Sequence, residues 1–416
     1  MLDRKSISSL SRCLNVAAHA QSRTWRWWHC QVLFRWLGML SLLAFENEPF
    51  SAPIGLRLIA NYSDNGPALA VALAEKTVYV AGRTAVDILD LTNPALPKRL
   101  GRYVVNGRKL AAFDGHFIVT VGSSHAEIVD ARDRQNPRRA ALLPAPGLEA
   151  ISEFVTSGTL AYEADPGFGL EILDVADPTN PRRLNNYPFR FGQASGIAAA
   201  DGYVYLVEFN FLEEQAFESR LRIIDVRDAT LPKTAGVYSK IGWPFPPFVK
   251  VAVSDSKACV VGKQSLRIID INDPSQPRAL GELALASTSV PLFVGSQILL
   301  PAGSDGLQII DASDPVELKR TGTFAATGAT DAVLSGNLVL LAASSGLLIL
   351  ELIERPLLRM ERLGESVRIS WEDDRFQIQV NADAAAKPSW QTMEGAASPL
   401  VQSLESTARF YRLILP

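Results

Sequence analysis

A short pattern of hydrophobic and polar positions recurs along most of the chain. Each copy has an apolar residue, a second residue that is polar in six of the seven copies, an isoleucine, another apolar residue and an acid. β-branched residues in such an alternation predict a strand, and the polar second position predicts that one face is partly exposed. The copies are Val86–Asp90, Ala126–Asp130, Leu170–Asp174, Leu221–Asp225, Leu266–Asp270, Leu307–Asp311 and Leu347–Glu351.

The acids that end successive copies are 40, 44, 51, 45, 41 and 40 residues apart. In each unit an apolar run such as Thr77–Ala81 precedes the pattern, and an alanine-rich run such as Ala68–Ala74 precedes that one. Another strand-like run follows, so the period predicts four short strands per unit. Paired-helix repeats have similar periods, but these runs are β-branched and are interrupted by glycine and proline. Small side chains suit the crowded innermost strands of a ring, so we expect a central channel with little chemistry beyond Glu153, Lys250 and backbone groups.

A second signature follows each of the first six copies. Three residues after the final acid comes an Asn or Asp, with proline one residue later, four residues later, or both. Such a side chain accepts a backbone N–H while proline fixes φ, which is typical of a turn. The residues are candidate ligands, but a capped connection between strands explains them better. They are Asn93, Asp133, Asp177, Asp228, Asp273 and Asp314.

The seventh copy lacks the full turn, whereas a strand-like run precedes the first unit. We therefore predict that the N-terminal strand 55–62 pairs with the last unit and closes the ring. This pairing would remove two exposed strand edges.

The repeated pattern and its turn resemble the LVIVD repeat family of β-propellers, whose units carry a Leu-x-Ile-x-Asp strand and an Asp-Pro-x-x-Pro turn. The resemblance covers about 300 residues, although Arg134, Ala229 and Glu351 depart from the pattern. It implies a propeller, often on an exported or surface protein, and no common reaction. The fold we predict is all-β, with a seven-bladed β-propeller of four-stranded blades over residues 54–356.

The remaining residues form two shorter segments. Residues 357–416 break the repeat, and their alternating runs predict a small β-sandwich-like module. With Ser389-Trp390 and Phe410–Leu413, this segment resembles C-terminal β modules of secreted proteins from Verrucomicrobia-type bacteria. Residues 1–52 are predicted to be a signal or leader segment, because arginines precede the ten-residue apolar run Trp36–Phe45.

That apolar run is too short for a stable membrane span. An uncleaved anchor or a misassigned start remains an alternative for the leader. We expect export to the periplasm, the cell surface or the medium of a bacterium.

Composition narrows the range of partners. The formal net charge is -3 and no basic cluster appears, which argues against nucleic acid. Cys259 is the single cysteine outside the leader and is expected to be a small buried apolar residue. No zinc spacing, P-loop or EF-hand pattern appears, so no metal or cofactor is predicted. We expect a monomer.

Enzyme signatures are equally weak. His116 and His125 are the only histidines outside the leader, and no nucleophile elbow is present. Propellers can carry dispersed catalytic residues, so the protein is predicted to be a non-enzymatic binding or scaffold protein. The alternative is a hydrolase or lyase with dispersed acidic residues at the channel mouth.

The longest insertions surround the fourth unit and are rich in aromatic residues and proline. Antiparallel topology brings all of them to one face, opposite the Asp-Pro turns. Aromatic side chains on stiffened loops bury much area at a low entropic cost, which favours binding of a protein or glycan partner. They could equally pack on one another as a cap. The candidate binding residues are Tyr187, Phe189, Phe191, Phe209, Phe211, Trp243, Phe245 and Phe248.

Overall fold

The protein is described by a computed structural model of its 416 residues. The described residues fall into two compact units, one within residues 54–354 and one within residues 359–414. They are residues 54–74, 76–121, 125–143, 153–166, 169–188, 192–212, 216–242, 248–354, 359–363, 366–371, 377–381, 391–393, 396–403 and 410–414. The predicted leader, residues 1–52, lies outside them.

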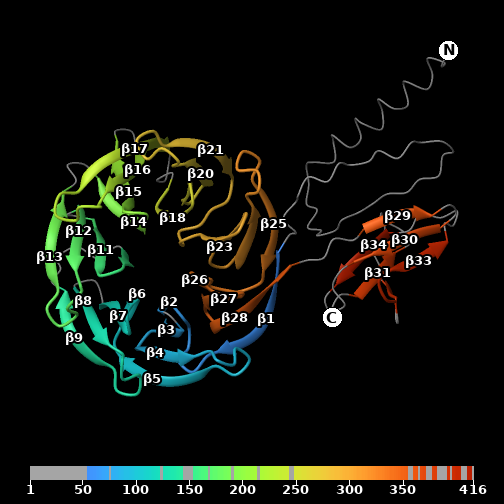
Figure 1. The fold of residues 1–416 in the computed structure, drawn as a ribbon, viewed down its shortest axis with the longest axis horizontal. Coiled ribbons are helices and arrows are strands. Elements are labelled where there is room, and N and C mark those ends of the chain that lie inside the picture. Colours follow the sequence, from blue (N-terminus) through green and yellow to red (C-terminus); the bar gives the residue numbers. More distant parts are fainter. Residues whose placement is uncertain are drawn as a thin grey trace, which may run out of the picture. The chain divides into compact units, whose positions relative to one another are not determined.

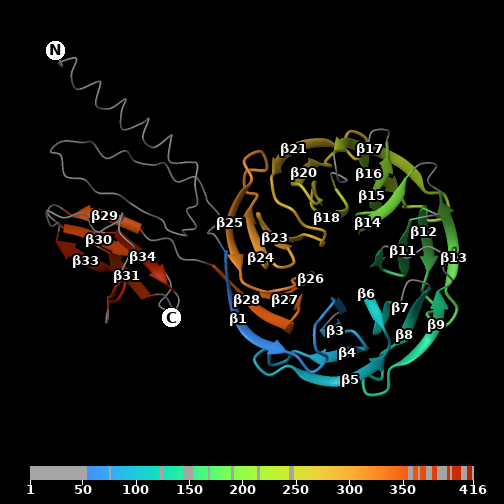
Figure 2. The ribbon, with the colours of Figure 1, turned by 180° about the vertical axis from the view of Figure 1, so that it is seen from behind.

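In the larger unit the described residues form seven four-stranded antiparallel sheets, arranged around a ring (Figures 1 and 2). We number them from the first unit of the repeat. Sheets one to six are β2–β5, β6–β9, β10–β13, β14–β17, β18–β21 and β22–β25, and sheet seven is β26–β28 with β1. For the described residues of this unit, the prediction of an all-β fold of four-stranded antiparallel sheets is therefore confirmed, and the arrangement is β-propeller-like.

Each sheet has an inner strand, two middle strands and an outer strand at the rim (Figure 1). The inner strands are β2 (Ala70–Ala74), β6 (Gly107–Phe113), β10 (Glu153–Ser157), β14 (Gln193–Ala200), β18 (Lys250–Ser254), β22 (Leu292–Val294) and β26 (Asp331–Ser335). The second strands are β3 (Thr77–Ala81), β7 (His116–Val121), β11 (Leu160–Asp165), β15 (Tyr203–Phe211), β19 (Lys257–Val261), β23 (Gln297–Pro301) and β27 (Leu338–Ala343).

The third strands carry the repeated pattern, and in sheets one to six the outer strands follow the Asn or Asp turns. The third strands are β4 (Ala85–Asp90), β8 (His125–Asp130), β12 (Gly169–Asp174), β16 (Phe217–Asp225), β20 (Leu266–Asp270), β24 (Leu307–Asp311) and β28 (Gly346–Glu354). The outer strands are β5 (Lys98–Val104), β9 (Arg138–Leu143), β13 (Arg182–Tyr187), β17 (Lys233–Gly242), β21 (Arg278–Leu283), β25 (Lys319–Phe324) and β1 (Ile54–Tyr62).

The outer strand of sheet seven comes from the beginning of the chain. β1 pairs antiparallel with β28, from Ile54 opposite Glu354 to Tyr62 opposite Leu347. The hydrophobic core is divided into clusters that lie between neighbouring sheets, and one of them joins sheet one to sheet seven through Val80, Leu89, Leu340 and Ile349. Apolar packing thus runs from each sheet to the next all the way around the ring.

The turn residues behave as predicted. The side chains of all six Asn and Asp residues accept the backbone N–H two residues later, at 2.9–3.2 Å. Three outer strands, β5, β17 and β21, make room for the next sheet's turn with a glycine. A Cβ at Gly281 would lie 2.1 Å from the carbonyl oxygen of Pro315 in the next sheet's turn, and one at Gly236 would lie 2.2 Å from that of Pro274. The six Asn and Asp residues of the turns therefore have a structural role.

The predicted partial exposure of the polar second position is wrong in four copies. Asp87, Glu127, Glu171 and Gln308 are buried. Each third strand is covered on both faces by neighbouring sheets, so its polar side chain needs a partner inside the protein. Asp87, with no exposed surface, accepts the Tyr62 hydroxyl at 2.7 Å and the Arg102 guanidinium at 2.6 and 2.9 Å.

The smaller unit contains two three-stranded sheets in its described residues. One has the order β29 (Arg359–Leu363), β30 (Ser366–Ser370), β33 (Leu400–Ser403), and the other β32 (Gln391–Thr392), β31 (Gln377–Asn381), β34 (Phe410–Ile414). Ile369, Trp371, Ile378 and Tyr411 are buried. No helix in the described part of the chain has the length and apolar character needed to cross a membrane.

Candidate functional site

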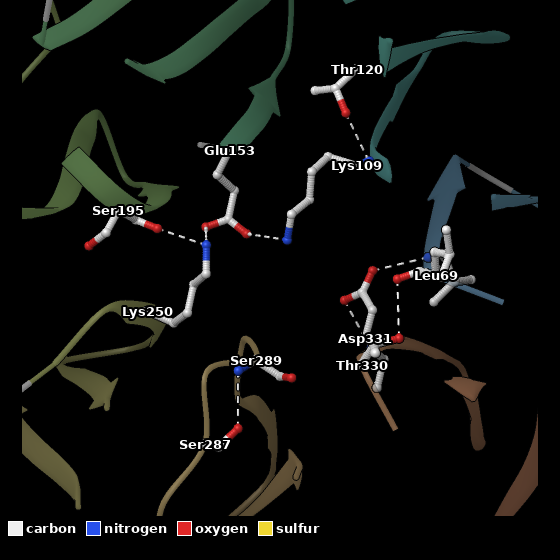
Figure 3. A network of polar contacts seen from close by, with 12 residues as sticks. Leu69, Lys109, Thr120, Glu153, Ser195, Lys250, Ser287, Ser289, Thr330 and Asp331 are labelled. Carbon is white, nitrogen blue, oxygen red and sulfur yellow. Dashed lines mark hydrogen bonds and ion pairs between the residues drawn. The ribbon is translucent and has the colours of Figure 1, made fainter. Parts of the chain in front are cut away.

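The inner strands bring four ionisable side chains from four sheets to the centre of the ring (Figure 3). They are Lys109 on β6, Glu153 on β10, Lys250 on β18 and Asp331 on β26, and we call them the channel cluster. Glu153, Lys250 and Asp331 are the first residues of their strands. The inner strands follow the same order of connections in every sheet, so these side chains lie at the same end of the channel.

Glu153 and Lys250 form the tightest contact of the cluster. The Lys250 Nζ lies 3.0 Å from Glu153 Oε2 and also donates to the backbone oxygen of Ser195 on β14, at 2.7 Å. Both side chains are buried, and burial lowers the pKa of Lys250 while the neighbouring Glu153 carboxylate opposes that shift. One ammonium group thus ties together the inner strands of sheets three, four and five.

Lys109 is the more accessible cation. Its side chain is 43% exposed, and its Nζ lies 3.9 Å from Glu153 Oε1, at the limit of an ion pair. The two lysines therefore flank one carboxylate from opposite sides of β10 (Figure 3). A loosely paired, accessible ammonium group can exchange its contact with Glu153 for a contact with an anionic or hydroxyl-bearing ligand.

Asp331 sits apart from the two lysines and is held by backbone groups. Its Oδ2 accepts the Val71 N–H of β2 at 3.0 Å, and its Oδ1 accepts the Ala332 N–H at 3.0 Å. Burial raises the pKa of Asp331 to about 6; Glu153 adds to the rise, while the amides and Lys109 oppose it. This raised pKa is a property that acid–base groups of enzymes share with buried structural carboxyls.

Sequence reasoning found half of this cluster. It identified Glu153 and Lys250, and it missed Lys109 and Asp331. Asp331 could have been found, because it opens its inner strand just as Glu153 and Lys250 do. The position of Lys109 could not be predicted, because the register of β6 with β7 is irregular between Gly107 and Leu110.

The predicted aromatic residues of the fourth unit separate into different environments. Phe209 and Phe211 lie at the end of β15, where their rings approach Phe217 of β16 at centroid distances of 6.1 and 4.3 Å. Phe211 remains 66% exposed. This end of the hairpin is at the same end of the strands as Ser195, to which Lys250 donates, since Gln193 pairs with Phe209.

The other predicted binding residues do not share the environment of Phe209 and Phe211. Phe248 is buried in the core between sheets four and five, where it stacks on Tyr238, so its side chain is not part of an exposed surface. The Tyr187 hydroxyl forms a hydrogen bond with Thr234 of sheet four. Phe189, Phe191, Trp243 and Phe245 lie outside the described residues.

Neither a metal centre nor a reactive thiol emerges from the side chains that the structure describes. No group of three or more His, Cys, Asp or Glu residues among them is placed to hold a metal ion. Cys259 is buried as predicted, and burial raises the pKa of its thiol. Its reactivity is therefore low.

Comparison with known protein families supports the repeat found in the sequence. The LVIVD repeat family model matches residues 65–105, 153–188 and 249–283. These matches support the LVIVD repeat family. Each matched LVIVD segment contains one whole sheet, namely sheet one, three or five. Among solved structures, the computationally designed Ika8 protein is similar with 11% identity and a TM-score of 0.47, over 72% of this chain and 100% of that chain. No curated protein matches the chain.

Proposed function

We propose that this chain is an exported binding or scaffold protein built on a seven-bladed LVIVD propeller, with residues 357–416 as a small β-sandwich-like module. Seven four-stranded sheets around one ring support the blade count. The two three-stranded sheets of the smaller unit support the sandwich. Export rests on the apolar run of the leader, and the resemblance of the C-terminal segment to modules of secreted bacterial proteins agrees with it.

The observation that carries the binding function is the gathering of polar and aromatic groups at one end of the ring. The channel cluster supplies ammonium and carboxylate groups from four sheets (Figure 3), and the β15–β16 hairpin supplies Phe209 and the exposed Phe211. Charged groups that fix orientation, beside aromatic surface that excludes water, are typical of recognition sites for a protein or a glycan. We place the partner on this face, around sheet four.

A photo-crosslinker at position 211 tests this placement in cells that make the protein. Benzoylphenylalanine in place of Phe211 should give a defined adduct, protein or glycan, because the partner covers this side chain. The matched control is Leu96, which is 73% exposed on the opposite face, in the turn that Asn93 and Pro94 begin. The same adducts from both positions, or none from position 211, would contradict the proposal.

A hydrolase or lyase is the second candidate, and Asp331 is the observation that favours it. With its pKa near 6, this carboxyl can take up and release a proton in the neutral range. If the channel is catalytic, a panel of glycoside and ester substrates should reveal an activity with an inflection near pH 6. Asp331→Asn should lower that activity at least roughly 100-fold, whereas Asp305→Asn in an exposed turn should not. Activity that survives in Asp331→Asn would remove this candidate.

A further inference from the structure

Sheet three contains a pair of buried carboxyl groups that no other sheet has. Glu163 on β11 pairs in register with Glu171 on β12, so both side chains project from the same face of the sheet. Both are fully buried. Residues directly opposite each other in antiparallel strands have Cβ atoms about 4.5–5.5 Å apart, which puts the two carboxyl groups within reach of each other.

The equivalent position on the second strand is apolar in the other six sheets. In each case it lies opposite the second residue of the repeated pattern. The residues are Val80, Val119, Leu206, Val260, Leu300 and Leu341. Glu163 is therefore a departure from the repeat and is not needed to build the sheet.

The neighbouring sheet also omits a hydrogen-bond donor here. In sheets seven and one, the outer strand carries a tyrosine, and the hydroxyls of Tyr62 and Tyr103 donate to Asp87 and Glu127 of the next sheet. Sheet two places Leu143 at the position that Tyr103 holds in sheet one, because each pairs with the first residue of its pattern. Among the described residues, no tyrosine hydroxyl of an outer strand donates to Glu171.

Acceptors therefore outnumber donors around this pair. Arg183 of β13 forms an ion pair with Glu171 at 2.7 Å, and Asp165 on the same face of β11 adds a third acid. The facing side of sheet two contributes apolar residues such as Ile118, Ile128 and Leu143. Neither oxygen of Glu163 has a hydrogen-bond partner among the described residues. A buried carboxylate without donors is costly, whereas a protonated one can donate.

We propose that Glu163 and Glu171 share a proton in the folded protein, and that loss of this proton loosens the packing between sheets two and three. The protonated carboxyl donates to the other, and Arg183 neutralises the single remaining charge. Without the proton, two adjacent carboxylates face one guanidinium in a buried site, with the charge of Asp165 nearby, and their mutual repulsion acts across the interface.

The direction of the pH effect follows from burial. Burial, reinforced by Glu171 and Asp165, raises the pKa of Glu163 to about 8, while Arg183 opposes the rise. Burial also raises the pKa of Glu171. Between the ordinary range of a glutamate and pH 8, the folded chain therefore holds a proton that the unfolded chain has released. Stability falls as pH rises through that window, and the local loosening sets in above pH 8.

Infrared titration of the wild-type protein tests the shared proton directly. A protonated carboxyl band should persist at pH 7.5, disappear with a midpoint near pH 8, and be absent from Glu163→Gln. If the band has already disappeared when the pH is raised to 6, the proposal is overturned. The midpoint is read from the wild-type protein, and the loss of the band in Glu163→Gln assigns it to this pair and not to Asp331.

Thermal unfolding and hydrogen exchange test the consequence. The melting temperatures of wild type and Glu163→Gln should differ least at pH 5.5, and the difference should grow by about 5 °C in favour of the variant at pH 8.5. Above pH 8, amides of β11 and β12 should lose protection relative to β19 and β20 of sheet five, in the wild type only. The loosening would be refuted if the melting temperatures of the two proteins changed equally with pH, or if the amides of both sheets were equally protected above pH 8. Glu317→Gln on the surface is the matched control.

Discussion

Deleting residues 53–64 should lower the melting temperature of the protein by roughly 10 °C or more. These residues include β1, which pairs with β28 along its whole length. Their loss would expose the edge of β28 and remove Tyr62 from the cluster between sheets seven and one. It would also leave Asp87 without the Tyr62 hydroxyl. Unpaired edges and lost apolar burial both destabilise the ring.

Calorimetry of the protein with and without this segment measures the effect. Leu58→Ala, at an exposed position on the same strand, is the control and should change the melting temperature little. A synthetic peptide of residues 53–64 should partly restore the deleted protein, because a ligand of the folded state stabilises it by mass action. An unchanged melting temperature after deletion would show that β1 does not hold the ring closed.

Asp87→Ala should destabilise the protein by about 3 kcal/mol, because it leaves the Tyr62 hydroxyl and the partly buried Arg102 guanidinium without their acceptor. The carboxylate is completely buried and accepts three hydrogen bonds, one from Tyr62 of sheet seven and two from Arg102 of its own sheet. Because Tyr62 belongs to the outer strand of sheet seven, the variant also weakens the junction at which the ring closes.

Chemical denaturation of Asp87→Ala and of a surface pair checks this estimate. Glu317 and Lys319 form an exposed ion pair at 3.2 Å, so Glu317→Ala should cost less than about 0.5 kcal/mol. The contrast between the two variants isolates burial as the cause. Similar losses in both would mean that the Asp87 network contributes no more than a surface contact.

The repeat shows how far sequence alone reaches. The pattern with isoleucine at its centre gave all seven third strands, because strand formation and the Asp-Pro turn are local properties of short segments. The same pattern gave a wrong prediction of the exposure of the polar second position. A polar residue between apolar ones predicts a solvent-facing side, yet Asp87 and Glu171 are buried, since each sheet is packed between two others. Local alternation carries no information about that second neighbour.

The candidate site, in contrast, depends mostly on the tertiary structure. Lys109, Glu153, Lys250 and Asp331 are separated by up to 222 residues (331 minus 109), and no local signal links them. Their approach to one another (Figure 3) depends on the ring, because the four residues belong to the inner strands of four different sheets. Among the predicted aromatic residues, Phe211 is exposed and Phe248 is buried, although both lie in the same insertion-rich region.

The sequence by itself determined the strands, their turns and their number per repeat, because these follow from hydrophobic period, β-branched residues and proline. Only the tertiary structure decided which polar side chains meet. Glu163 and Glu171 became a pair through cross-strand register, and the missing donor from sheet two became visible only when that sheet was placed beside sheet three. Register and the packing of one sheet on the next are long-range properties, and they set the burial, the charge and hence the chemistry of these groups.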